Sequence, residues 1–145
     1  MKALIQRVKT ASVEIDGKIV SKIGQGLLVL LGVVKGDEQD NAELLADKLL
    51  KLRIFEDENG KMNRSLVDVG GEMLVVSQFT LCGDCKKGTR PSFDKSAPPE
   101  IANELYEYFV TQIRQAQIPC QTGVFGADMQ VSLVNDGPVT FMVEK

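Results

Sequence analysis

The sequence predicts a single α+β domain in which a mixed β-sheet is covered by two helices. Three observations support this class: strand-like segments occupy both ends of the chain, two separate segments have the apolar spacing of amphipathic helices, and no internal repeat, linker or low-complexity segment divides the chain. A length of 145 residues is enough for one hydrophobic core. We therefore expect residues 1–145 to form one domain.

The first half of the chain contains three expected strands and one helix. The stretch from Lys2 to Ile15 alternates in places between apolar and polar residues, and Asp16-Gly17 is typical of a hairpin turn, so two antiparallel strands are expected there. The apolar run from Leu27 to Val34 suits a central strand that is covered on both faces. Between Asp37 and Leu52, leucines recur at helical spacing, and Asp37 or Asp40 can cap the helix that they predict. These leucines are Leu44, Leu45, Leu49 and Leu52.

The second half alternates between strands and turns around one more helix. A short strand at 53–56, a turn at 57–60 and a strand from Glu72 to Leu81 are expected first. The segment from Cys82 to Ala97 lacks periodicity, which indicates a functional loop in a compact domain. Pro98-Pro99 then opens a helix that reaches about Gln117. Its expected buried stripe is Ile101, Leu105, Phe109 and Ile113, and three closing strands are expected at 121–125, 129–134 and 139–143.

Composition excludes several classes of protein. The chain has no histidine, which removes Ser-His-Asp and Cys-His catalysis and the commonest metal ligand. A net charge of −3 argues against broad coating of nucleic acid but leaves a local RNA contact open. No apolar run approaches the roughly 18 residues that span a bilayer, and the N-terminus lacks the pattern of a signal peptide. We therefore expect a cytoplasmic protein whose three cysteines are reduced.

Three motif blocks carry a resemblance to a known family. The first is Gln6-Arg7-Val8 with Ala11-Ser12-Val13. The second is Ser77-Gln78-Phe79-Thr80-Leu81 followed by Lys87-Gly88-Thr89-Arg90-Pro91-Ser92-Phe93. The third is Gly123-Val124-Phe125-Gly126-Ala127-Asp128-Met129 followed by Asn135-Asp136-Gly137-Pro138-Val139-Thr140. With these blocks the chain resembles the D-aminoacyl-tRNA deacylase family from residue 1 to the last strand. The resemblance implies a curved sheet, a homodimer, and hydrolysis of the ester in D-aminoacyl-tRNA or in glycine mischarged on alanine tRNA.

The resemblance implies that Ser77, Gln78, Phe79 and Thr80 line a catalytic pocket. From residue types alone, hydroxyls that satisfy backbone groups at the end of a strand are the favoured explanation of Ser77 and Thr80, and the resemblance reverses this preference. Thr80 is the candidate nucleophile, but a hydroxyl needs a base and the chain has no histidine. We therefore expect backbone N–H groups near Phe79 to hold the oxyanion and the 2′-hydroxyl of the terminal adenosine to assist the attacking water.

The resemblance also assigns a chirality filter to Gly137 and Pro138. Only about 5–6% of X-Pro bonds are cis, so the base rate favours a trans turn between two strands, whereas the resemblance implies a cis bond. In the family this element enters the active site of the other subunit, and its two carbonyl oxygens would exclude an L-side chain. Arg7 is expected to brace this loop, and a solvated charge at a strand edge is the alternative.

The remaining candidates line the pocket or contact tRNA. Ala102, Phe125 and Met129 match pocket positions of the family, and each also suits ordinary helix or core packing. Lys86, Lys87 and Arg90, with Lys95, form a basic cluster that suits tRNA phosphates, and a merely solvated loop is the alternative.

A further motif, Cys82-x-x-Cys85, is typical of redox or zinc sites, but only Cys120 remains as another soft ligand where zinc takes four. We therefore expect no metal and no cofactor. The rival function is a non-catalytic tRNA-binding or zinc-dependent interaction module.

Overall fold

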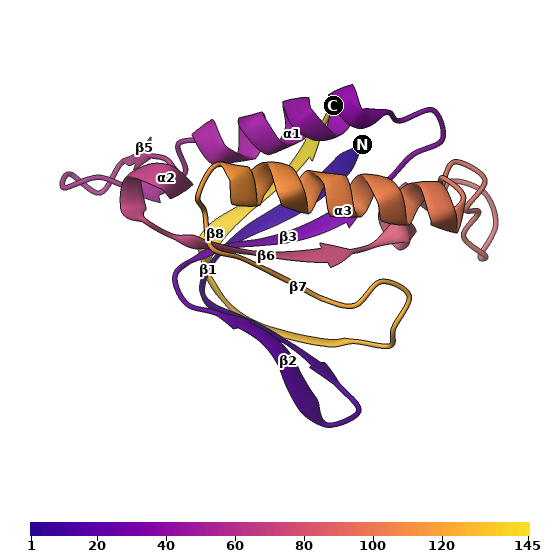
Figure 1. Ribbon diagram of the computed structural model, residues 1–145, viewed down its shortest axis with the longest axis horizontal. Coiled ribbons are helices and arrows are strands. Elements are labelled where there is room, and N and C mark those ends of the chain that lie inside the picture. Colours follow the sequence, from indigo (N-terminus) through magenta and orange to yellow (C-terminus); the bar gives the residue numbers. More distant parts are fainter.

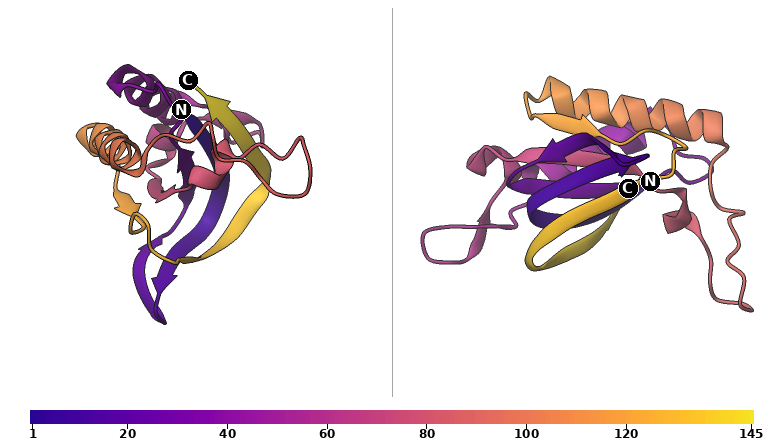
Figure 2. Two further views of the ribbon diagram at one scale, coloured as in Figure 1. Left: turned by 90° about the vertical axis from the view of Figure 1, so that its right-hand side faces the viewer. Right: turned by 90° about the horizontal axis from the view of Figure 1, so that it is seen from below.

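A six-stranded mixed sheet carries two long helices on one of its faces in the computed structural model, which describes residues 1–145 (Figure 1). Two further views show both helices on that face and a strongly bent sheet (Figure 2). The strand order is β2-β1-β3-β6-β7, and β8 pairs with β1. The strands are β1 (Lys2–Ile15), β2 (Lys18–Ile23), β3 (Gly26–Gly32), β6 (Glu72–Ser77), β7 (Cys120–Thr122) and β8 (Gln130–Glu144).

The expected opening hairpin is confirmed. Asp16 and Gly17 join β1 to β2 with φ angles of 50° and 77°, the left-handed pair that a two-residue hairpin requires. Strand β1 runs antiparallel to β2, β3 and β8, whereas β3, β6 and β7 are parallel to one another. The parallel strands β3 and β6 therefore end at the same edge of the sheet.

Two of the helices are long and the other helical segments are single turns. The long ones are α1 (Gln39–Lys51) and α3 (Pro99–Gln115); the short ones are α2 (Leu66–Val69) and the 3-10 helix η1 (Phe79–Cys82). A small two-stranded ribbon, β4 (Phe55–Glu56) with β5 (Met62–Arg64), follows α1. None of these helices is long and apolar enough to cross a bilayer.

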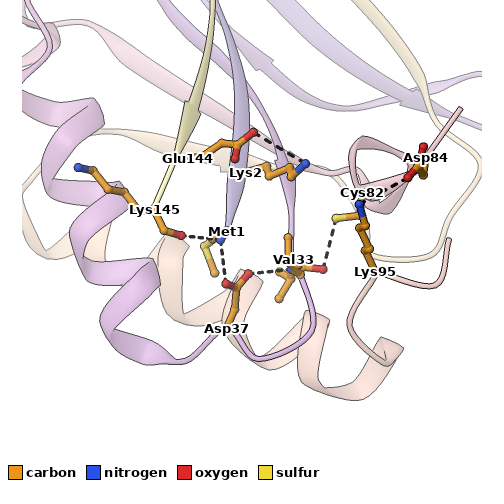
Figure 3. Close-up of polar contacts among 10 residues, drawn as sticks. Met1, Lys2, Val33, Asp37, Cys82, Asp84, Lys95, Glu144 and Lys145 are labelled. Atoms are coloured by element: carbon orange, nitrogen blue, oxygen red, sulfur yellow. Dashed lines mark hydrogen bonds and ion pairs between the residues drawn. The ribbon is translucent and has the colours of Figure 1, made fainter. Parts of the chain in front are cut away.

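Two details of the expected helices were wrong, the cap of α1 and the burial of Ile101. Glu38, not Asp37 or Asp40, caps α1, and its side chain forms a capping box with Asn41. Asp37 instead accepts a hydrogen bond of 2.8 Å from the ammonium group of Met1 (Figure 3). Leu44 and Ile101 are exposed. Ala102 and Tyr106 take the place expected for Ile101 in the buried face of α3.

Two hydrophobic clusters fill the two faces of the sheet. The larger lies between the helices and the sheet and contains Leu27, Val29 and Leu31 of β3. The smaller lies on the opposite face, inside the bend of the sheet, and contains Leu28 of the same strand. Alternate residues of β3 thus point to different clusters, which confirms the expectation that this strand is covered on both faces.

The C-terminal strands differ from the expected pattern. Strand β6 ends at Ser77 rather than Leu81, because the chain turns into η1. Strand β7 comprises only residues 120–122, and β8 continues from Gln130 through Gly137–Pro138 to Glu144, where two strands and a turn were expected. Residues 136–139 of β8 bulge out opposite a single residue of β1, Arg7, because Gln6 pairs with Thr140 and Val8 with Asn135.

Candidate active site

A cavity of about 540 Å³ lies at the edge where β3 and β6 end. Its lining comes from four places in the sequence: the end of β3, the end of β6 with the residues after it, the start of α3 with the residues before it, and the connection between β7 and β8 with the start of β8. The candidate residues among its lining are Ser77, Gln78, Phe79, Ala102, Phe125 and Met129. The cavity thus brings together three of the expected catalytic residues and all three expected pocket walls.

The backbone after β6 leaves one donor without a partner in the helix that follows. The N–H of Gln78 donates to the carbonyl of Leu31 at 2.8 Å, which fixes the segment against β3. The chain then enters η1 at Phe79, and the first N–H groups of a helix have no acceptor within the helix. The N–H of Phe79, a residue that lines the cavity, therefore has no acceptor within η1.

Thr80 lies outside the lining of the cavity. Its side chain is exposed, and its hydroxyl accepts a hydrogen bond from the Gln78 amide. Nearby, Cys82 is buried beside the carbonyl of Val33, and burial raises the pKa of its thiol (Figure 3). Neither side chain has the environment of an activated nucleophile.

Asp128 is the ionisable side chain that lines the cavity. It was not among the expected site residues, although it belongs to the third motif block. The signal in the sequence is the acidic residue that directly follows Gly126 and Ala127 in that block. Ser96, Ala97 and Pro99 also line the cavity and were not expected.

The walls of the cavity are held by the core. Ala102 is buried on α3. The ring of Phe125 lies against Tyr106 at a centroid distance of 6.2 Å. The hydroxyl of Tyr106 donates to the carbonyl of Val75 at 2.8 Å, and burial raises its pKa to about 12. Met129 packs so closely on Gly123 that a Cβ atom there would lie 2.5 Å from the sulfur. Phe125 and Met129 therefore both pack on the core and line the cavity.

The bulge at 136–139 is fastened by Arg7 and Asn135. Arg7 is 4% exposed; its Nε donates to the carbonyl of Asp136 at 2.9 Å and its Nη1 to the carbonyl of Ile54 at 2.7 Å. The Asn135 amide donates to the carbonyls of Arg7 at 2.9 Å and Val139 at 3.2 Å. Arg7 thus contacts the bulge and is not a solvated charge, whereas the role of Asn135 was not expected.

Gly137 and Pro138 lie at the exposed part of this bulge. The peptide bond between them is cis. A Cβ atom on Gly137 would collide with Oδ1 of Asn135, so a larger residue there would displace the side chain that fastens the bulge. Neither residue lines the cavity of its own chain. One chain therefore does not bring the expected chirality filter and the expected catalytic residues together.

Comparison with known proteins identifies the family. The family described as D-Tyr-tRNA(Tyr) deacylase matches residues 4–144. A D-aminoacyl-tRNA deacylase of Geotalea daltonii is 63% identical over 99% of this chain and 96% of its own. That of Thermosipho africanus is 60% identical over 99% of this chain and 97% of its own. The chain belongs to the D-aminoacyl-tRNA deacylase family. It is accordingly a hydrolase that acts on D-aminoacyl-tRNA.

Solved structures share the fold of this deacylase. One, described as c-Myc DNA Unwinding Element Binding Protein, has a TM-score of 0.94 and 44% sequence identity, and covers 100% of this chain and 99% of its own. A second, described as a probable eukaryotic D-amino acid tRNA deacylase, has a TM-score of 0.83. It is 18% identical over 99% of this chain and 98% of its own, so it shows the likeness of the fold alone.

The basic cluster of the deacylase lies on a projecting loop. Lys86, Lys87 and Arg90 are exposed between Cys85 and Pro91, and the loop projects from the N-terminal end of α3 (Figure 2). Lys95, at the base of the loop, pairs with Asp84 at 3.5 Å, whereas the other three cations form no ion pair. Cys82 and Cys85 are both free thiols. No group of three or more metal-ligating side chains is present.

Proposed function

We propose that this deacylase hydrolyses the ester between the terminal adenosine of tRNA and a D-amino acid or a mischarged glycine, and that it rejects L-amino acids. The observation that carries the proposal is the cavity at the end of β6, whose wall holds Ser77, Gln78 and Phe79. Its size suits a terminal nucleoside with a small acyl group. The expected product is free amino acid and intact tRNA.

The proposed chemistry depends on backbone donors and on the RNA itself. The N–H of Phe79 polarises the ester carbonyl and holds the developing oxyanion, an effect worth roughly 3–4 kcal/mol per donor. The neighbouring 2′-hydroxyl of the substrate orients or activates the attacking water. An aminoacyl ester is already reactive, so this assistance is sufficient. The exposed position of Thr80 and the raised pKa of Cys82 support a mechanism without a covalent intermediate.

The proposed stereochemical filter comes from a second subunit. The carbonyl oxygens of Gly137 and Pro138 would hold the α-ammonium group and collide with an L-side chain, whereas a D-side chain points to solvent. Three observations support insertion into a partner: the bulge is exposed, it is fastened by Arg7, and it does not line the cavity of its own chain. The functional unit proposed here is therefore a homodimer with active sites at the subunit interface.

The basic loop is proposed to contact phosphates near the tRNA 3′ end through Lys86, Lys87 and Arg90, because these are exposed cations without ion-pair partners in an acidic protein.

Since the substrate is made and used in translation, we propose a cytoplasmic location and a role in chirality proofreading.

The test is a deacylation series on one enzyme preparation with D-tyrosyl-, L-tyrosyl- and glycyl-tRNA. We expect the D-ester and the glycyl ester to lose their amino acid much faster than in buffer, and the L-ester to remain. Efficient cleavage of the L-ester, or inertness toward the glycyl ester, would contradict the carbonyl filter. Binding of tRNA without hydrolysis of any ester would instead favour the non-catalytic binding module.

A further inference from the structure

Two exposed aromatic rings stand beside the candidate active site. Phe79 is 54% exposed and Phe93 is 40% exposed, and their ring centroids are 5.1 Å apart with a tilt of 59°. Phenylalanine is among the residues that are most often buried, so a pair with this much free surface is unusual. The catalytic proposal uses the backbone of Phe79 and leaves both rings without a role.

The backbone around Phe93 is fixed by its neighbours. The N–H of Asp84 donates to the carbonyl of Ser92 at 2.8 Å and the N–H of Ser92 returns a bond of 3.0 Å to Asp84, which closes the base of the basic loop. The carbonyl of Phe93 accepts from the N–H of Ser96 at 3.0 Å. The ring packs on Gly83, where a Cβ atom would lie 3.0 Å from it. The aromatic pair is thus held in place before any ligand binds.

The pair connects two depressions of different character. Phe79 lines the cavity of about 540 Å³. Gly83, on which Phe93 packs, lines a second hollow of about 430 Å³, and so do the three basic residues Lys2, Lys86 and Lys95. Asp84 is the acidic side chain of this hollow, and it pairs with Lys95 (Figure 3). Lys2 pairs with Glu144 at 3.8 Å, which leaves Lys86 as the lysine of the hollow without an ion-pair partner. A path that leaves the cavity over the aromatic rings therefore reaches a hollow whose lining has more basic than acidic side chains.

We propose that this surface is a track for the single-stranded 3′ end of the RNA, and this inference rests on the proposed function. The terminal adenosine occupies the cavity, the unpaired base that precedes it stacks on the Phe79–Phe93 pair, and the lysines of the hollow contact the backbone phosphates. Aromatic faces bind unpaired bases of any sequence, and cations beside them follow the phosphates. The track gives affinity for every tRNA, because all of them offer an unpaired end.

The experiment compares a long and a minimal substrate on the same variants. Wild type, Phe93→Leu and Phe93→Tyr are assayed with D-tyrosyl-tRNA and with adenosine that carries a 3′-O-D-tyrosyl ester. Leucine keeps the packing on Gly83 but has no ring, whereas tyrosine keeps the ring. For Phe93→Leu we expect KM for the tRNA to rise about tenfold, as for the loss of one stacked base, with kcat unchanged. The adenosine ester should be hydrolysed as by wild type, and Phe93→Tyr should behave as wild type on both substrates.

Matched controls separate the track from general surface effects. Leu44→Ala removes an exposed apolar side chain from α1 and should leave both substrates unaffected. Lys86→Ala should weaken tRNA binding and reduce its salt dependence, whereas Lys48→Ala, an exposed lysine on α1, should do neither.

The outcomes distinguish this inference from the proposed function. An equal loss on the tRNA and the adenosine ester, or no loss on either, would mean that Phe93 only packs the loop and would overturn the track. If the wild-type enzyme hydrolysed neither D-tyrosyl-tRNA nor the adenosine ester, both the proposed function and the track would be overturned.

Discussion

At the scale of single residues, two side chains near the site are alternatives to the 2′-hydroxyl of the substrate as the group that assists hydrolysis. Thr80 has its hydroxyl outside the cavity, whereas the carboxylate of Asp128 belongs to the lining of the cavity. We predict that Thr80→Ala and Asp128→Asn each retain kcat within about tenfold, because neither group performs the chemistry. A tRNA whose terminal adenosine lacks the 2′-hydroxyl should lose far more. Single-turnover deacylation measures all three.

The contrary result is equally informative. General bases contribute about 100-fold to 10,000-fold, so a loss of that size in Asp128→Asn with a deoxy substrate that remains good would identify the carboxylate as the base.

Arg7 is the residue on which the bulge at 136–139 depends. Its guanidinium makes two hydrogen bonds to carbonyl oxygens and lies 3.3 Å from a carboxylate oxygen of Asp136. Arg7→Ala leaves the buried carbonyl of Ile54 without its donor, so we predict a loss of about 3 kcal/mol in the free energy of unfolding and a lower kcat/KM. Arg53→Ala, an exposed arginine without a hydrogen bond, is the control for urea denaturation and should stay within about 0.5 kcal/mol of wild type.

At the scale of elements, the contact between β3 and β6 positions the cavity. Gly26 pairs with Glu72 so closely that a Cβ atom would lie 1.8 Å from the carbonyl oxygen of Glu72. We predict that Gly26→Ala costs about 3 kcal/mol or more, because the two backbones must separate. At Gly24, two residues away, a Cβ atom would meet only Oε2 of Glu72 at 3.5 Å, so Gly24→Ala should melt near wild type. Similar melting temperatures for the two variants would contradict this account.

The elements that the sequence predicted well are those with a strong local pattern. The hairpin at Asp16-Gly17 and the doubly covered β3 depend on turn residues and on a continuous apolar run, which are visible in the sequence. Gly137–Pro138 resembled a turn because Arg7, whose side chain holds the bulge, lies near the other end of the chain. Ile101 was expected in the core because the spacing of α3 does not say which of two neighbouring apolar residues faces the sheet.

The same distinction holds for the site. The motif at 77–79 predicted the cavity wall, since residues at a strand end are presented to one edge of the sheet. Thr80 was placed there by its motif, but the turn into η1 directs its side chain to solvent. Asn135 escaped notice because its contacts with Arg7 and Val139 arise only when β8 pairs with β1.

At the scale of the whole molecule, the separation of bulge and cavity gives a test of the proposed dimer. Ala102→Phe should fill the cavity, and Gly137→Ala should disrupt the bulge, so each homodimer should be inactive. When the two variants are refolded together at equal amounts, each mixed dimer regains one intact site. We predict recovery of about a quarter of the wild-type rate, because half of the dimers are mixed. If the bulge serves its own chain, the mixture will remain inactive.

The pairing of β1 with β8 joins the first strand of the chain to the last one, with Lys2 opposite Glu144. Synthesis proceeds from the N-terminus, so β1 leaves the ribosome long before β8, its outer partner, has been made. During this interval one whole side of β1 offers unpaired N–H and C=O groups, which are a template for association with another nascent chain. A pause in translation before Gln130 thus produces a chain that has most of its core but an unpaired edge on β1. Only the pairing of β8 with β1 removes this edge.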